Sequence, residues 1–217
     1  MAASSAYSIA PTIGHAADID GTEGARADLY GLLARLWFAP PDAALLARVH
    51  AVARSAPPAP QTDGFLAMPW RGLVDRLRAT SAAEAAEEFD ALFVSVGKPE
   101  ILAYGSQYLA GALNQTPLVR LRSDLAALGL ARDPARGETE DHIAFEFEVM
   151  RWLIRGDDLA VCNLEQQRRF FRQHLQTWVE ALCDSVIDHP GARVMRDVAV
   201  LTRAFVQLEA QAFDMIE

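Results

Sequence analysis

Five carboxylates and one histidine fall within 14 residues of this chain, between Gly137 and Met150. Glu138, His142 and Glu146 are spaced four residues apart, so a helix that began early enough would place all three side chains on one face. Carboxylate and imidazole groups gathered in this way can bind a metal ion. They can also be purely structural, because acidic side chains at a helix start stabilise its positive end by about 0.3–1 kcal/mol each. The pattern alone leaves both interpretations open.

The metal interpretation is weakened by the ligand types. A catalytic zinc ion takes three protein ligands, usually with two or more from histidine or cysteine, and no second histidine is close to His142 in the sequence. A carboxylate-bridged di-iron site needs Glu-x-x-His pairs on two helices, which this sequence lacks. We therefore predict no metal site and keep a metal-dependent helical enzyme using Glu138, His142 and Glu146 as the alternative. Helix capping explains the carboxylates but not His142, since the positive end of a helix disfavours a protonated imidazole.

A second group of chemically capable side chains lies upstream, where a Gly-Ser pair stands between Tyr104 and Tyr108. Tyrosines with one polar end are common at the edge of a core and as anchors in peptide-binding grooves. Ser106 lacks the Gly-x-Ser-x-Gly context of a hydrolase nucleophile, and no predicted strand precedes it. We interpret this segment as a loop that presents aromatic rings, without catalytic residues.

The elements that position these groups are all predicted to be helices. Apolar residues recur at helical spacing from residue 25 to 38, where Pro40 and Pro41 end the pattern, and similar patterns follow along the chain. Ser81 and Glu84 form a capping box for a helix whose predicted exposed face carries Glu84, Glu87, Glu88 and Asp90. No alternating strand pattern and no internal repeat is present. The sequence predicts an all-α bundle of roughly eight to ten helices.

The predicted organisation has four parts. Residues 1–24 are rich in Ala, Ser, Gly and Asp and are expected to be a disordered N-terminal segment. Residues 25–130 form an N-terminal helical half that contains the aromatic loop, and residues 140–217 form a C-terminal helical half. Residues 131–139, with Pro134 and Gly137, are the predicted hinge between the halves.

Composition limits the classes of function. The 217 residues carry a formal net charge of −9, which argues against nucleic-acid binding and favours a basic partner. No run of 18 apolar residues indicates a membrane span, and residues 1–24 lack the features of a secretory signal. Cys162 and Cys183 are too few for a disulfide framework and are expected to be reduced. We predict a cytoplasmic protein without stable membrane insertion.

Three segments, taken in order, resemble the TorD/DmsD/NarJ family of redox-enzyme maturation chaperones. They are residues 89–93 (Phe-Asp-Ala-Leu-Phe), residues 104–108 (Tyr-Gly-Ser-Gln-Tyr) and residues 138–150, which begin Glu-Thr-Glu-Asp-His. The helix that carries Phe171, His174 and Trp178 also looks like the C-terminal half of that family. The sequence departs from the family pattern at Ala103, Tyr104 and Thr139, where members often have Pro, Trp and Pro, and this leaves the client enzyme open.

The resemblance implies an all-helical TorD-like chaperone that binds the twin-arginine leader, or another part, of an apo-molybdoenzyme and assists cofactor insertion before export. It implies no catalytic residues, and no cofactor of the chaperone itself is predicted. Residues that border the leader-binding region in the family correspond here to a set that we predict as the peptide-binding site: Phe93, Tyr104, Gly105, Ser106, Tyr108, Asp141 and His142.

Charge agrees with this partner, because a twin-arginine leader is cationic and then apolar. The acidic residues expected to pair with its arginines are Glu87, Glu88, Asp90, Glu138, Glu140 and Asp141. The predicted hinge also suggests exchange of one half between protomers, so we expect a monomer or a domain-swapped homodimer. A generic helical adaptor with a different partner is a further alternative.

Overall fold

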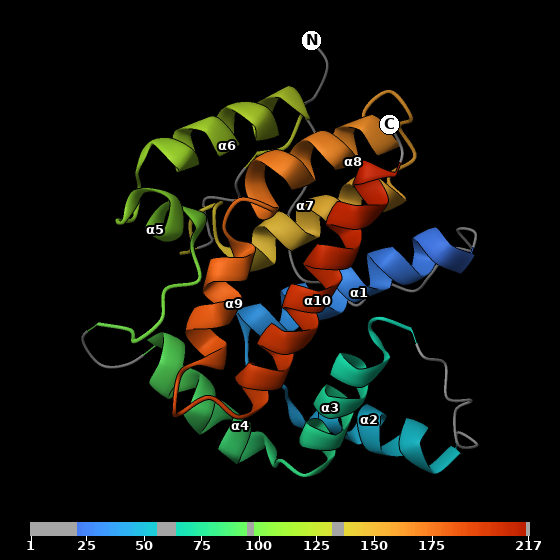
Figure 1. Cartoon of the computed structure of the whole chain (residues 1–217), viewed down its shortest axis with the longest axis vertical. Helices are drawn as coiled ribbons and strands as arrows, with labels where there is room; N and C mark the ends of the chain where they lie inside the picture. Colours follow the sequence, from blue (N-terminus) through green and yellow to red (C-terminus); the bar gives the residue numbers. More distant parts are fainter. Residues whose placement is uncertain (1–20, 56–63, 95–97, 132–136, 216–217) are drawn as a thin grey trace. The chain divides into compact units, whose positions relative to one another are not determined.

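The computed structural model of the chain describes residues 21–55, 64–94, 98–131 and 137–215, and leaves out the side chains of residues 52–55. These ranges hold ten α-helices, which Figure 1 labels, and two π-helical turns, which we name η1 and η2. The described residues also contain one isolated antiparallel β-bridge. The all-α prediction is confirmed. The elements are α1 Gly21–Phe38, α2 Ala43–Ser55, α3 Ala67–Arg78, α4 Ala82–Phe89, η1 Asp90–Val94, α5 Gly105–Ala110, α6 Thr116–Ala127, α7 Ile143–Arg155, α8 Leu164–Phe170, η2 Phe171–Leu175, α9 Val179–Ile187 and α10 Val194–Asp214.

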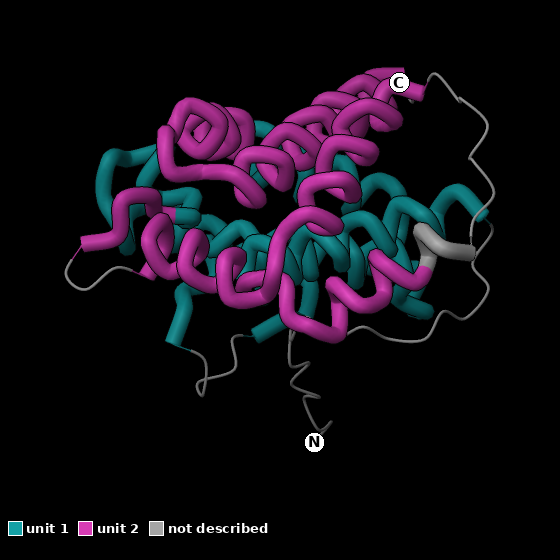
Figure 2. Tube along the Cα trace, turned by 90° about the horizontal axis from the view of Figure 1, so that it is seen from below, with its two compact units in different colours: residues 1–38, 103–178 teal, residues 39–102, 179–217 magenta. Residues whose placement is uncertain are grey.

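The chain divides into two compact units, each built from two separate stretches of sequence (Figure 2). Unit 1 comprises residues 1–38 and 103–178, and unit 2 comprises residues 39–102 and 179–217. Each unit therefore takes segments from both of the predicted halves, because α1 packs on α7 in unit 1 and α3 packs on α10 in unit 2. Such pairings join helices far apart in sequence, which helical spacing does not reveal.

Two predicted segments lie partly outside the described residues. Residues 132–136 of the predicted hinge and residues 1–20 of the predicted N-terminal segment are not described. Residues 21–24 are helical and begin α1, four residues before the start expected from the apolar pattern. The predicted end of this helix at Phe38 is confirmed.

Unit 1 is organised around α7, which packs along α1 and also contacts α8 and η2. Every residue from Ile143 to Met150 is buried. The ring of Phe147 meets that of Tyr30 edge-on, with centroids 5.6 Å apart. Gly31 lets the two helices approach, because a Cβ atom there would lie 3.0 Å from Cδ of Arg151. Burying large apolar side chains contributes about 1.5–3 kcal/mol each, so this contact is a main source of stability in unit 1.

Unit 2 is organised around α10, which contacts α3, α4 and α9. Glu88 of α4 accepts hydrogen bonds from the backbone N–H groups of Arg193, Val194 and Met195 at distances of 2.8–3.0 Å. The prediction that Glu88 lies on an exposed face is therefore wrong, because its carboxylate is buried against donors that the first turn of α10 leaves unpaired. The capping box of Ser81 and Glu84 is confirmed.

Two further observations concern the described residues as a whole. Cys162 and Cys183 are both buried and form no disulfide. We find no described helix that has both the length and the apolar character needed to cross a bilayer.

Candidate functional site

The segment predicted as an aromatic loop is helical from Gly105 to Ala110, so the loop prediction is wrong for these residues. This helix, α5, begins against the start of α7 in unit 1. Tyr104 and His142 form the isolated β-bridge. The N–H of Gly105 donates to the carbonyl of Asp141 at 2.8 Å, and the N–H of Ile143 donates to the carbonyl of Ala103 at 3.0 Å. These backbone bonds join two segments that sequence analysis had singled out separately. They also fix where α5 begins.

Asp141 fastens α5 through its side chain. One carboxylate oxygen accepts from the backbone N–H of Ser106 at 3.0 Å and from the Ser106 hydroxyl. The other accepts from the Thr139 hydroxyl at 2.6 Å. Asp141 is only 2% exposed and Ser106 is fully buried. Because three donors already surround this carboxylate, Asp141 positions α5 from beneath and does not face solvent as a partner for arginine.

His142 is the N-cap of α7. Its Nδ1 accepts a hydrogen bond from the N–H of Ala144 at 3.2 Å, which satisfies a donor that the first turn leaves unpaired. Burial lowers the pKa of His142 to about 4, since desolvation of the imidazolium outweighs the attraction of Asp141. The ring is therefore neutral at pH 7. This resolves the sequence puzzle of a histidine at a positive helix end, because a neutral imidazole accepts a hydrogen bond there.

We call the hydrogen-bonded pair of Asp141 and Ser106 the clamp. An aromatic layer lies next to it. The indole N–H of Trp178 donates to the carboxylate of Glu146 at 3.1 Å and to the carbonyl of His174. Tyr108 stacks on the indole, with ring centroids 5.7 Å apart and planes 25° apart. Burial raises the pKa of Glu146 well above its usual value, although the indole bond works in the opposite direction.

Gly105 is the residue that allows this packing. A Cβ atom at position 105 would lie 3.2 Å from two atoms of the Trp178 indole and 3.5 Å from an oxygen of Glu146. Only a residue without a side chain leaves the indole in its present position without adjustment of its neighbours. Gly105 therefore serves the close approach of the backbone to the Trp178 ring.

Trp178 was predicted to lie in one helix with Phe171 and His174, and its contact with the segment around Ser106 was not predicted. The available signal was the indole N–H, since a buried tryptophan usually finds a hydrogen-bond acceptor. Its acceptor, Glu146, lies 32 residues away, and no local pattern links the two.

The exposed part of this region differs from its buried base. Tyr104 and Tyr108 are half-buried, and Leu109 and Leu113 are 44% and 37% exposed. The Tyr104 ring meets His142 edge-on at 5.0 Å, and its hydroxyl bonds the carboxylate of Glu138. We call the surface formed by Tyr104, Tyr108, Leu109, Leu113 and Glu138 the α5 face. It combines apolar area with an acidic edge.

Not every residue of the predicted site belongs to this cluster. Phe93 lies in η1 of unit 2, where its ring is 4.9 Å from that of Phe89. Glu140 is paired with Arg122 through both carboxylate oxygens at 2.9–3.0 Å. Of the acidic residues predicted to face the client in this part of unit 2, Glu87 of α4 and Asp90 of η1 are exposed.

The three residues of the metal alternative have separate partners. Glu138 bonds Tyr104, His142 caps α7 and Glu146 accepts from Trp178. Within the described ranges, we find no group of three or more histidine, cysteine or acidic side chains arranged to hold a metal ion.

A family model described as the nitrate reductase delta subunit matches residues 60–184, which is more than half of the chain. The chain belongs to the nitrate reductase delta subunit family. The family match spans α5, α7 and Trp178, and so covers every element that builds the site.

Individual sequence relatives point in the same direction. The chaperone protein TorD of Vibrio cholerae is 27% identical over 202 residues, covering 87% of this chain and 92% of that protein. The chaperone protein TorD of Photobacterium profundum is 27% identical over 143 residues, covering 62% and 66%. A solved structure, a redox enzyme maturation protein from Archaeoglobus fulgidus, has a TM-score of 0.50 and 18% identity over 92% of this chain and 98% of that one, and this likeness concerns the fold.

These comparisons confirm the predicted membership of the TorD/DmsD/NarJ family. They also confirm the prediction of a chaperone rather than an enzyme, since the TorD relatives are chaperones.

Proposed function

We propose that this family member is a cytoplasmic chaperone that binds the twin-arginine leader, or another part, of an apo-molybdoenzyme and assists cofactor insertion before export. Membership of the nitrate reductase delta subunit family and the TorD relatives support a role in redox-enzyme maturation. The finer parts of the proposal, namely the leader and the molybdoenzyme, rest on the chemistry of the α5 face.

The observation that carries the proposal is the contrast between the exposed α5 face and its rigid base. Two half-buried tyrosines and the exposed Leu109 and Leu113 offer apolar contact area, and Glu138 adds a carboxylate at the edge. A segment that is cationic and then apolar matches this surface. The net charge of −9 would also steer such a segment toward the chain.

The residues of the predicted site take two kinds of role in this proposal. Tyr104 and Tyr108 contact the client directly. Gly105, Ser106, Asp141 and His142 are buried and hold the α5 face in shape. Phe93 is half-buried in unit 2 and stays a predicted client contact.

The test substitutes the two exposed leucines of the α5 face. In the double variant Leu109→Glu and Leu113→Glu, two carboxylates replace apolar contacts. We expect at least a tenfold loss of affinity, because a tenfold loss corresponds to about 1.4 kcal/mol and burying one leucine contributes at least about 1.5 kcal/mol. Binding is measured by fluorescence anisotropy with a labelled twin-arginine leader peptide. Thermal unfolding should change little, because both side chains are already exposed.

A matched control is Met68→Glu in α3 of unit 2, where the methionine is 71% exposed. It should leave leader affinity unchanged. Equal affinity of the double variant and the unmodified chain would exclude the α5 face as the leader-binding surface.

The proposal includes the assembly state expected from the sequence, a monomer or a domain-swapped homodimer. Light scattering after serial dilution separates these two, because a swapped dimer dissociates slowly. A mass that stays monomeric at every concentration excludes the swapped form.

A further inference from the structure

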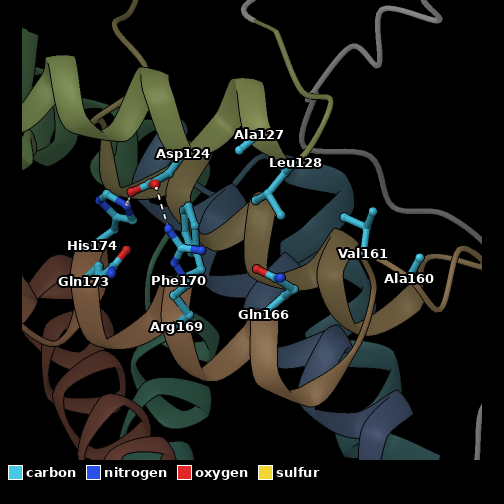
Figure 3. Close-up of a pocket in the computed structure, with 10 residues that line it drawn as sticks. All are labelled: Asp124, Ala127, Leu128, Ala160, Val161, Gln166, Arg169, Phe170, Gln173 and His174. Atoms are coloured by element: carbon cyan, nitrogen blue, oxygen red, sulfur yellow. Dashed lines mark hydrogen bonds and ion pairs between the residues drawn. The ribbon is translucent and has the colours of Figure 1, made fainter.

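A separate cavity of about 160 Å³ lies in unit 1, where the end of α6 faces α8 and η2 (Figure 3). Its polar end is formed by Asp124 of α6 with Arg169 and His174, and its apolar side includes Leu128, Val161 and Phe170. None of the residues of the α5 face or its clamp lines this cavity. Its volume suits a single side chain and is too small for a folded element.

The carboxylate of Asp124 is the charged group at the polar end. One oxygen lies 2.8 Å from Nε2 of His174, and the other lies 3.4 Å from a guanidinium nitrogen of Arg169 (Figure 3). Burial lowers the pKa of His174, against the opposing effect of Asp124, so the imidazole is neutral at pH 7 and donates an N–H. The Asp124 carboxylate therefore accepts a hydrogen bond from a neutral ring and is not paired with an imidazolium.

Arg169 holds Asp124 only loosely. Its side chain is 54% exposed and its contact with Asp124 is long for a charged hydrogen bond. Exposed ion pairs of this kind contribute about 0–1 kcal/mol, so a competing guanidinium can replace Arg169 at small cost. The position of Arg169 also demonstrates that a guanidinium group fits over this carboxylate.

The remaining walls suit the rest of an arginine side chain. The Phe170 ring and the side chains of Leu128 and Val161 offer apolar contact for methylene groups. Gln166 and Gln173 add amide oxygens that can accept further N–H groups (Figure 3). Gln173 and His174 belong to the π-helical turn η2, and π-helical turns occur frequently at functional sites.

We infer that this cavity seats one arginine side chain of a basic client segment, with its guanidinium on Asp124 in place of Arg169 and its methylene groups against Phe170. This inference rests on the proposed function for the origin of the arginine. Arginine fits better than lysine, because its planar fork can bond a carboxylate with two N–H groups and lie flat on a ring. Arg169 is then an internal competitor for the Asp124 carboxylate.

Two substitutions change affinity in opposite directions. Asp124→Asn keeps an acceptor for His174 but removes the charge, and should weaken a synthetic peptide with an Arg-Arg pair followed by an apolar run by about tenfold or more. Arg169→Gln removes the competitor and should strengthen binding by about two- to fivefold. Each arginine of the peptide is then replaced in turn by citrulline, its neutral isostere. At one of the two peptide positions, this replacement should abolish the effects of both Asp124→Asn and Arg169→Gln on affinity.

The matched control is Asp184→Asn in unit 2, which breaks a comparable exposed pair with Arg203 at 2.8 Å. It should leave peptide affinity unchanged. Peptide binding of equal strength to the unmodified chain and to Asp124→Asn overturns the arginine pocket and leaves the proposed function standing.

A second readout works without any leader peptide. N-acetyl-arginine methylamide is titrated while the imidazole resonances of His174 are followed by NMR. A shift in the unmodified chain that disappears in Asp124→Asn supports the pocket, even where the leader peptide fails to bind and the proposed function fails with it. Absence of a shift, or the same shift in both proteins, overturns the pocket.

Discussion

The two units differ in what they bury. Among the described residues, seven buried polar or charged side chains belong to unit 1 and three to unit 2. Those of unit 1 are Ser106, Asp141, His142, Glu146, Glu148, Gln167 and His174, and those of unit 2 are Glu88, Thr202 and Glu209. A buried polar group costs free energy unless it is hydrogen-bonded. A unit that carries many of them is more than an apolar scaffold, and here it is the unit that presents the α5 face.

Asp141 and Glu88 make the difference concrete. Both are buried carboxylates that accept from backbone N–H groups at the start of a helix. Glu88 caps the 21-residue α10 and so serves the fold of unit 2. Asp141 holds α5, which has six residues, contains Tyr108 and has Tyr104 as its N-cap. The same chemistry supports a core helix in one unit and a candidate binding surface in the other.

The largest expected effect comes from removing each carboxylate. Asp141→Ala leaves the N–H and hydroxyl of Ser106 and the hydroxyl of Thr139 without this acceptor, and Glu88→Ala does the same to three N–H groups of α10. Each should lower the free energy of unfolding by about 2–4 kcal/mol, measured by urea denaturation. Asp141→Ala alone should also weaken leader binding under conditions where both variants are folded. Equal leader binding by the two variants would remove the functional half of the comparison.

A smaller effect is expected in how the unfolding free energy depends on pH, through Glu148 of unit 1. Burial raises the pKa of Glu148 in α7 to about 7, although Arg151 at 3.2 Å works against the shift. A carboxyl whose pKa is raised on folding adds stability below its unfolded value of 4.5, and this stability is lost as pH rises to about 7. The unfolding free energy of Glu148→Gln should therefore decrease less between pH 4.5 and about 7 than that of the unmodified chain, by roughly 1–3 kcal/mol.

His142 acts in the opposite direction. Its pKa is lowered to about 4, so its contribution is present above pH 6.5 and is lost as pH falls. Comparing Glu148→Gln with the unmodified chain at each pH cancels this contribution, because both proteins contain His142. Glu180→Gln, an exposed change in α9 of unit 2, is the control and should leave the pH profile unaltered. Parallel profiles for Glu148→Gln and the unmodified chain would contradict the assignment.

The smallest effect is expected on the surface, where the two units should behave alike. Arg122→Gln in unit 1 breaks the pair with Glu140, and Arg203→Gln in unit 2 breaks the pair with Asp184. Both arginines are more than a third exposed, so each change should cost less than about 1 kcal/mol in thermal unfolding. A much larger loss of stability for Arg122→Gln than for Arg203→Gln would mean that the two units differ at the surface as well as in the interior.

Local sequence was sufficient for the helices and for part of the site. Apolar spacing, prolines and the capping box of Ser81 and Glu84 are read within one or two turns, and the all-α fold follows from them. The motif around Asp141 and the loop around Ser106 were both recognised as important. Their hydrogen bond was not predicted, because it joins side chains 35 residues apart.

Burial was the property that local patterns misjudged. Glu88 and Asp141 were expected to face a cationic partner, since charged residues usually lie at the surface. Glu88 is buried because the start of α10 supplies three N–H donors at one point. Asp141 is buried because one N–H at the start of α5 and the hydroxyls of Ser106 and Thr139 converge on it. In both cases the donors offset the cost of removing a carboxylate from water.

The sequence by itself determined the helical class and the family, and it predicted a binding site in the segments around Tyr104 and His142. Tertiary structure decided the role of each side chain within them. It turned Asp141 and His142 into supports, brought Trp178 beneath Gly105 and grouped Asp124 with Arg169 and His174. The reason is physical: helical propensity depends on neighbours within a few residues, whereas burial, pKa and hydrogen-bond partners depend on groups that only folding brings together.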